Sequence, residues 1–187
     1  MRYRRHWRRR PRSLWRSLLD TGIFAIAAAL VLIALRIFNQ ATVTPGAADI
    51  IDGDSFRLGK DEIRLHGIDA PEYRQTCRDE KKRDWNCGRA AADALRRLVT
   101  GRQVACKGLD ADRYGRLVSR CTAGGIDLNA EMVRLGWAIA YTRHAYIYVD
   151  QEVEARTERR GVWRGTFDLP EDWREINRSN LHRAPHD

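Results

Sequence analysis

The sequence contains no C-x-x-C pair, and none of its four cysteines has a histidine at the spacing typical of zinc ligands. These absences argue against a zinc cluster. Internal repeats and low-complexity tracts are also absent, apart from an arginine block at the N-terminus. The chain of 187 residues is therefore not a repeat protein, and its length suits one domain of ordinary size plus an additional segment.

Acidic residues are missing from the start of the chain. Residues 1–16 hold eight arginines and no acid, and residues 1–38 hold nine arginines with Asp20 as their one acid. The other 149 residues carry 25 basic and 24 acidic side chains, so their formal charge is about +1, although the whole chain has +9. A high net charge normally suggests a nucleic-acid partner. Here the net charge gives no such indication, because most of the excess positive charge lies before residue 39.

A long apolar run follows the arginine block and reads GIFAIAAALVLIAL. The segment 21–38 approaches the roughly 20 residues of a spanning helix if Arg36 reaches the interface. We expect residues 21–38 to form a transmembrane signal anchor, with residues 1–20 in the cytoplasm and the rest extracytoplasmic, which in a bacterium is the periplasmic side. One alternative is a cleaved signal peptide with a secreted product, but no A-x-A site follows Phe38. The other is a buried helix of a soluble protein.

The rest of the chain divides by composition. Residues 39–47 are small and polar and are typical of a linker. We therefore expect the domain to span residues 48–167, and a polar tail to follow at residues 168–187.

Apolar segments of strand length alternate with segments of helical periodicity in this domain. Four segments are expected to pair as two hairpins, namely Asp49–Leu58 with Glu62–Ile68, and Gln103–Leu109 with Arg116–Thr122. Helices are predicted at Gly88–Val99, Leu128–Ala138 and Tyr148–Arg160. The pattern predicts an α+β domain, in which a small β-barrel packs against about three α-helices.

Two carboxylates flank a glycine in DGDSF, where the first expected hairpin carries a polar interruption. An EF-hand loop starting at Asp52 would need glycine and glutamate where Arg57 and Ile63 stand, so that motif is excluded. A simple turn is one interpretation, because Asp and Gly are common turn residues. A metal site is the other, because carboxylate oxygens bind Ca²⁺ or Mg²⁺ and further acids and arginines occur at the ends of nearby strands.

The chain resembles the staphylococcal nuclease (thermonuclease) family over residues 48–163, and the motifs that carry the resemblance are IDGDSFRL, IRLHGIDAPE, DRYGR and LNAEMVRLGWAIAY. The resemblance implies an OB-fold barrel of five strands with three helices. It also implies metal-dependent hydrolysis of phosphodiester bonds in DNA or RNA, with Ca²⁺ or another divalent cation as cofactor. No protein partner is expected.

The same resemblance implies roles for single residues. Those that would hold the metal are Asp54, Asp69, the backbone carbonyl of Ala70 and, through its water shell, Asp52. Glu72 would be the general base, and Arg64 and Arg116 would bind the phosphate. Tyr114 and Tyr141 resemble positions close to the nucleotide.

Disulfides are the default for four cysteines in an exported domain. Cys106 and Cys121 lie on consecutive expected strands, and Cys77 and Cys87 bracket the charged loop RDEKKRDWN. We therefore expect pairing of Cys77 with Cys87 and of Cys106 with Cys121. Four free thiols in a reducing compartment are the alternative.

These observations together predict a membrane-anchored, extracytoplasmic, metal-dependent nuclease. A first alternative is a nuclease-like barrel that binds nucleic acid or protein without catalysis. A second is a soluble lipoprotein-like or secreted structural protein, which would be favoured only if Arg64 and Arg116 pointed away from the carboxylates.

Overall fold

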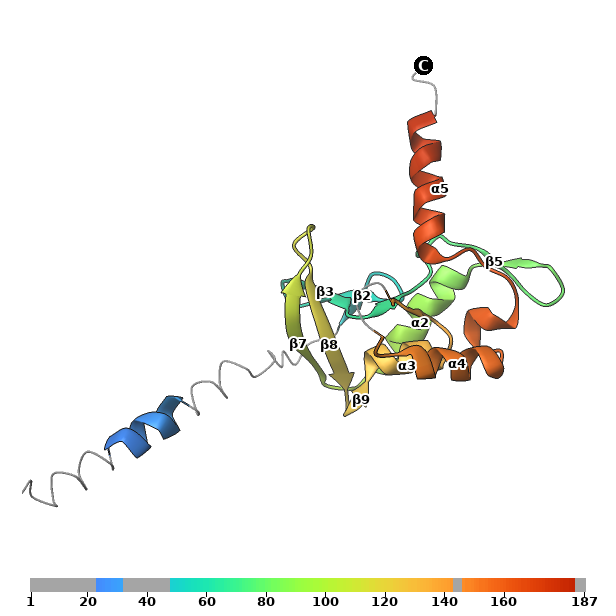
Figure 1. Ribbon diagram of the computed structural model, residues 1–187. Helices are drawn as coiled ribbons and strands as arrows, with labels where there is room; N and C mark the ends of the chain where they lie inside the picture. The colour runs from blue at the N-terminus through green and yellow to red at the C-terminus, as the bar shows by residue number, and fades with distance from the viewer. Residues whose placement is uncertain (1–22, 32–47, 143–145, 184–187) are drawn as a thin grey trace, which may run out of the picture. The chain divides into compact units, whose positions relative to one another are not determined.

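A computed structural model describes residues 23–31, 48–142 and 146–183 of the chain (Figure 1). The chain divides into two compact units, residues 1–40 and 41–187, and each is considered by itself. In the first unit, residues 23–31 are helical. Within the described residues, no helix has both the length and the hydropathy needed to cross a membrane. The predicted anchor at residues 21–38 lies outside the described residues except for this helical stretch.

A mixed sheet forms the centre of the second unit. Its main path runs through β1 (Asp49–Ile50), β2 (Ser55–Leu58), β3 (Asp61–Leu65), β8 (Leu117–Ala123) and β7 (Val104–Ala111). Neighbours on this path are antiparallel, except for β3 and β8, which are parallel. The short strand β9 (Ile126–Asp127) pairs with β8 at the side of this path. Two further pairs of short strands are β4 (Ile68–Asp69) with β10 (Ile139–Ala140), and β5 (Cys77–Arg78) with β6 (Asp84–Trp85).

The hairpin of β2 and β3 follows from alternation of apolar and polar residues. Phe56 and Leu58 in β2, and Ile63 and Leu65 in β3, are buried at every second position. Gly59 makes the turn between them with a φ of 63°. The expected strand Asp49–Leu58 is in fact two strands, because a turn at residues 51–54 separates β1 from β2.

Four α-helices and one 3-10 helix occur among the described residues of this unit, and they are α2 (Cys87–Val99), α3 (Leu128–Arg134), α4 (Val149–Thr157), η1 (Gly161–Arg164) and α5 (Pro170–Arg183). Asn86 caps α2 and Asp127 caps α3 through side-chain hydrogen bonds. Helix α3 ends before the predicted Ala138 because Gly136 has a φ of 72°, which breaks the helix. Helix α5 was not predicted and lies in the expected polar tail.

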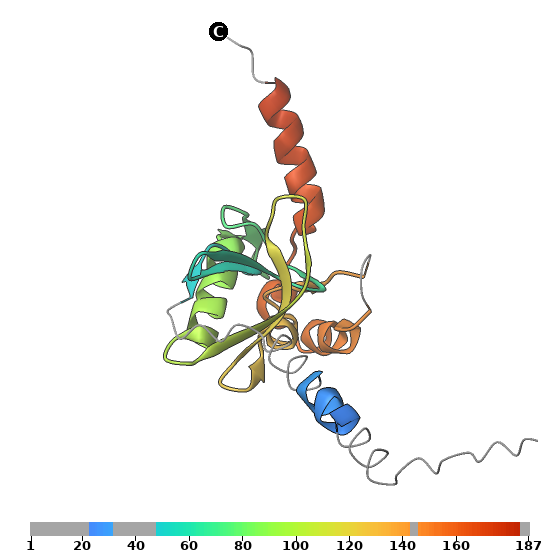
Figure 2. The same cartoon turned by 90° about the vertical axis from the view of Figure 1, so that its left-hand side faces the viewer.

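The core lies between the sheet and helices α2 and α3, whose buried faces contact it (Figures 1 and 2). Among its largest fully buried side chains are Phe56, Leu95, Leu128 and Met132. Both views show α5 projecting from the body of the domain, so only its N-terminal part is close to the other elements (Figures 1 and 2). The α+β class predicted from the sequence is confirmed.

Two disulfides staple this unit, and both have the predicted pairing. Cys77 is bonded to Cys87, with their Cα atoms 5.6 Å apart, and Cys106 is bonded to Cys121, with a Cα–Cα distance of 4.1 Å. The first closes the β5–β6 hairpin and the second joins directly opposed residues of β7 and β8. No cysteine remains free.

Asn129 is a fully buried polar side chain that ties α3 to the sheet. Its Oδ1 accepts a hydrogen bond from the amide of Cys121 (3.0 Å), and its Nδ2 donates to the carbonyls of His66 (2.9 Å) and Ser119 (3.2 Å). The side chain therefore bonds to three backbone groups and links α3 to the strands, and the Ser119 carbonyl also accepts a hydrogen bond from the His66 amide (2.8 Å).

We expect Asn129→Ala to lower the free energy of unfolding by about 2–4 kcal/mol, because the Cys121 amide and the His66 carbonyl lose the hydrogen bonds that the buried side chain makes to them. Asn86→Ala removes the same side chain from an exposed helix cap and should cost only about 1 kcal/mol. Urea titrations of both variants measure the difference. Equal losses would contradict the role assigned to Asn129.

Candidate active site

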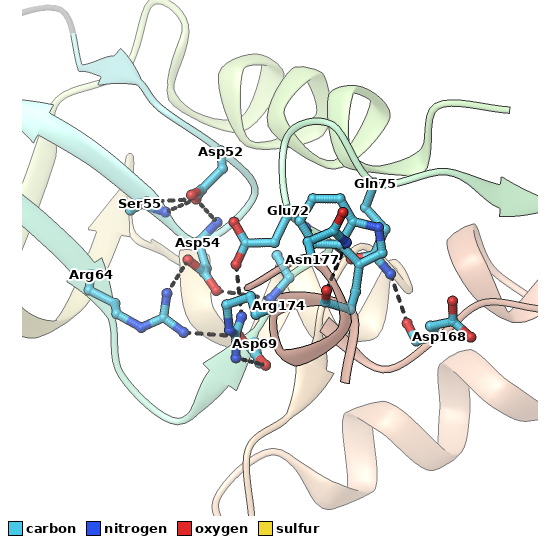
Figure 3. A network of polar contacts seen from close by, with 12 residues as sticks. Asp52, Asp54, Ser55, Arg64, Asp69, Glu72, Gln75, Asp168, Arg174 and Asn177 are labelled. Carbon is cyan, nitrogen blue, oxygen red and sulfur yellow. Dashed lines mark hydrogen bonds and ion pairs between the residues drawn. The ribbon is translucent and has the colours of Figure 1, made fainter. Parts of the chain in front are cut away.

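Asp52 shapes the turn between β1 and β2. Its Oδ1 accepts hydrogen bonds from the amides of Asp54 (3.0 Å) and Ser55 (2.7 Å) and from the Ser55 hydroxyl (2.6 Å). The turn interpretation of this residue is therefore correct as far as Oδ1 is concerned. One consequence of the turn is that it directs Asp54 into the interior (Figure 3).

Asp54 is a buried carboxylate, with 2% of its surface exposed. Its Oδ2 accepts a hydrogen bond from the amide of Ala70 (2.9 Å), and its Oδ1 accepts one from Arg64 Nη1 (2.7 Å). Burial raises the pKa of Asp54 well above its usual range; Arg64 opposes this effect, while Asp52 and Asp69 add to it. A further positive charge at this place would stabilise the ionised form.

Arg64 bridges the two buried aspartates (Figure 3). Besides its bond to Asp54, it donates from Nη2 to Oδ1 of Asp69 at 3.0 Å, and Asp69 has no exposed surface. Attraction to Asp54 is the main cause that raises the pKa of Arg64, so the guanidinium stays charged. The predicted residues of the two motifs DGDSF and IRLHGIDAPE thus meet at one point.

Arg174 of α5 is a second guanidinium in this network, and the sequence did not predict it. It donates from Nη1 to Oδ1 of Asp69 (3.0 Å), from Nη2 to Oδ2 of Asp69 (2.9 Å), and from Nη1 to Oε1 of Glu72 (2.9 Å) (Figure 3). The residue lies 105 positions after Asp69 in a polar segment. No motif marked it, so only the fold brings it here.

Glu72 lies on a loop that is fixed by hydrogen bonds to a buried glutamine. Gln75 has no exposed surface, and its Oε1 accepts a hydrogen bond from the Glu72 amide (3.1 Å), while the Gln75 amide donates to the Glu72 carbonyl (2.7 Å). Gly88 packs against the same loop: a Cβ atom at this position would lie 1.8 Å from the Glu72 carbonyl oxygen. The backbone at Glu72 is therefore fixed from two sides.

Arg116 lies at the turn between β7 and β8 and is bonded to Asp112 of the same DRYGR motif. Asp112 accepts a hydrogen bond from the Arg116 Nε (2.7 Å), and the guanidinium lies 5.6 Å from the ring centre of Tyr114, whose surface is 68% exposed. Arg116 thus contacts Asp112 and not the buried aspartates. Tyr141 donates its amide to the carbonyl of Gly67 (2.9 Å).

One pocket of about 850 Å³ brings most of these residues to a common surface. The predicted site residues that line it are Asp52, Arg64, Glu72, Tyr114, Arg116 and Tyr141, and Arg174 lines it as well. The buried Asp54 and Asp69 lie behind this lining, bonded to Arg64. The pocket is therefore large enough and polar enough for an anionic substrate next to the carboxylates.

The charges of the network favour a cation. Three carboxylates, those of Asp54, Asp69 and Glu72, pair with the guanidinium groups of Arg64 and Arg174, and the carboxylate of Asp52 lies beside them in the adjoining turn (Figure 3). Among the described residues, no group of three or more His, Cys, Asp or Glu side chains is arranged so that it could hold a metal ion. Asp54 and Asp69 nevertheless supply two carboxylates of the kind that Mg²⁺ and Ca²⁺ bind, and such cations can fill their other positions with carbonyl oxygen and water.

The comparisons with known proteins agree with this geometry. Residues 62–165 match the family described as "Staphylococcal nuclease homologue". "Succinoglycan biosynthesis protein ExoI" of Rhizobium meliloti (strain 1021) is 34% identical over 122 residues, which cover 64% of this chain and 64% of that protein. "Uncharacterized endonuclease" of Escherichia coli O157:H7 is 33% identical over 128 residues, 65% of this chain and 77% of that protein. "Probable staphylococcal-like nuclease CAN1" of Oryza sativa subsp. japonica is 30% identical over 135 residues, 68% of this chain and 36% of that protein.

Gly53 gives a test of how tightly the DGDSF turn is packed. A Cβ atom at this position would lie 2.7 Å from Cβ of Ala70 and 2.8 Å from Cβ of Ala91. We expect Gly53→Ala to lower the free energy of unfolding by about 1–3 kcal/mol through overpacking.

The matched control is Gly108→Ala on β7, where nothing lies within 4 Å of an added Cβ atom. This variant should be neutral or slightly more stable, because it restricts only the unfolded chain. Urea denaturation distinguishes the two. A Gly53→Ala variant as stable as Gly108→Ala would contradict the close approach.

Proposed function

Because the chain belongs to the staphylococcal nuclease family, we propose that it is a nuclease that hydrolyses phosphodiester bonds of DNA, RNA or both. The observation that carries this proposal is the meeting of Arg64, Asp54 and Asp69 behind a pocket that Glu72 lines. A module that only binds has no need for buried aspartates next to a half-exposed glutamate. The names of the relatives from Escherichia coli and Oryza sativa support the same class of enzyme.

Glu72 is the proposed general base. It takes a proton from the water that attacks phosphorus, while the bond from phosphorus to the leaving oxygen breaks. Arg64 and Arg116 bind the phosphate oxygens, because a guanidinium matches their charge and geometry. Tyr114 and Tyr141, on the same pocket, are proposed to contact the nucleotide.

The proposed cofactor is Ca²⁺, with another divalent cation as the alternative. Asp54, Asp69 and the carbonyl of Ala70 would hold it, and Asp52 would support its water shell. When bound, it would neutralise negative charge on the phosphate. Burial raises the pKa of Asp54, and a bound cation would oppose this effect by favouring the ionised carboxylate.

We further propose that the nuclease domain is extracytoplasmic and anchored by residues 21–38. Eight arginines in residues 1–16 support a cytoplasmic N-terminus. The two disulfides of the domain support an oxidising compartment. A cleaved and secreted form is the alternative.

Glu72→Gln keeps the size of the side chain but cannot accept the proton. We expect its turnover on DNA or RNA to fall by about 10²- to 10⁴-fold, with nucleic-acid binding retained. Glu80→Gln, in the exposed loop between Cys77 and Cys87, makes the same chemical change and should cleave like the wild type. A wild-type protein that binds nucleic acid in the presence of Ca²⁺ without cleaving it would favour the binding module instead.

A reporter fused after Asp187 tests the location. It should be active on the extracytoplasmic side and remain with the membrane fraction. Activity confined to the cytoplasm would reverse the proposed orientation. Release of a shortened fusion into the medium or periplasm would favour the cleaved form.

A further inference from the structure

Helix α5 brings a residue into the active site from outside the segment that matches the family. The match covers residues 62–165, and α5 begins at Pro170. Arg174 on its second turn nevertheless makes three hydrogen bonds of 2.9–3.0 Å to Asp69 and Glu72. Its side chain is 30% exposed, and the Asp69 side chain is not exposed at all.

The chain segment that precedes α5 is hydrogen-bonded to the region of the loop that carries Glu72. Gln75 accepts from the Glu72 amide through Oε1 and donates from Nε2 to the carbonyl of Asp168 at 2.8 Å. Arg78 and Thr166 exchange two backbone hydrogen bonds of 2.8 and 2.9 Å just before this point. A buried side chain and a β-bridge therefore set where the helix starts, so Arg174 is delivered to the carboxylates by the fold.

Arg174 and a cation need the same oxygen atoms. The Arg174 guanidinium donates hydrogen bonds to both oxygens of Asp69, and Arg64 also donates to Oδ1. Each oxygen of Asp69 therefore already has a donor. A cation that binds Asp69 must share these crowded oxygens with Arg174 and is repelled by the charge of the guanidinium, so the two compete for Asp69. The bond from Arg174 to Glu72 uses a separate acceptor and need not break at the same time.

We propose that Arg174 is a positioning residue of this active site, one that competes with the cation for Asp69 and holds Glu72 in place for the reaction. This inference rests on the proposed function, since it requires both a cation and a base. It leads to opposite effects on two measurable quantities. Loss of the guanidinium makes Asp69 easier for the cation to reach, and leaves Glu72 without its side-chain partner.

The test uses the full-length protein in detergent and the variant Arg174→Gln. Calorimetric titration with Ca²⁺, without nucleic acid, should give a dissociation constant about 3- to 10-fold lower than that of the wild type. At saturating Ca²⁺, kcat on DNA or RNA should fall about 10-fold with KM little changed, because only the orientation of the base is lost.

Two further variants separate charge from geometry. Arg178→Gln removes the same charge one helical turn further along α5. Arg178 also lines the pocket, but its side chain is exposed, so the Ca²⁺ dissociation constant should stay within about 2-fold of that of the wild type. Arg174→Lys keeps the charge but not the fork, so its Ca²⁺ affinity should stay close to that of the wild type and its kcat should lie between those of the wild type and Arg174→Gln.

The expected changes of Arg174→Gln in Ca²⁺ affinity and in kcat have opposite signs, and this distinguishes the possible outcomes. Weaker Ca²⁺ binding together with lower kcat would mean that Arg174 only supports the fold, and unchanged values would mean that its contacts are irrelevant; either result overturns the inference while the nuclease proposal stands. A wild-type protein that neither binds Ca²⁺ nor cleaves nucleic acid overturns both. An increase in Ca²⁺ affinity with a decrease in kcat supports both.

Discussion

Two aspartates in the interior of the domain, joined by one arginine, are the constraint on which the rest of the site depends. Removing a carboxylate from water is costly unless it is paired and hydrogen-bonded, and Asp54 and Asp69 are almost entirely buried. Arg64 contacts both, and the amide of Ala70 completes the shell of Asp54. Arg64 belongs to β3, Asp69 to β4 and Asp54 to the turn directly before β2, so the same bonds that neutralise the acids also fix three parts of the chain against one another.

The local features of this arrangement could be predicted from the sequence. The helices α2 and α3, the hairpin of β2 and β3 and the pairing of neighbouring cysteines depend on residues close together along the chain, and these predictions agree with the structure. Helix ends were less accurate. Gly136 stops α3 early, and Arg159, with a φ of 52°, follows the end of α4 before the predicted Arg160. A single residue with positive φ decides such an end, and periodicity does not reveal it.

The contribution of α5 could not be predicted in the same way. Its polar composition is typical of a tail, and Arg174 resembles any other surface arginine in a chain with 34 basic residues. Its place follows from contacts between residues about one hundred positions apart, through Gln75 and Asp168. Arg116 illustrates the reverse case: sequence reasoning put it beside the other site residues, and the structure shows that it lines the pocket while its nearest acid is Asp112 of its own motif.

The loop between Cys77 and Cys87 carries a separate consequence. Its base is closed by a disulfide and by the pairing of β5 with β6, whereas Lys81, Lys82 and Arg83 at its tip are exposed. The ends of the loop stay together whatever lies between them, so the number of residues at the tip is not dictated by the core. Related chains can therefore differ in loop length here at little cost in stability, and the tip is a suitable place to introduce an epitope or a fluorophore.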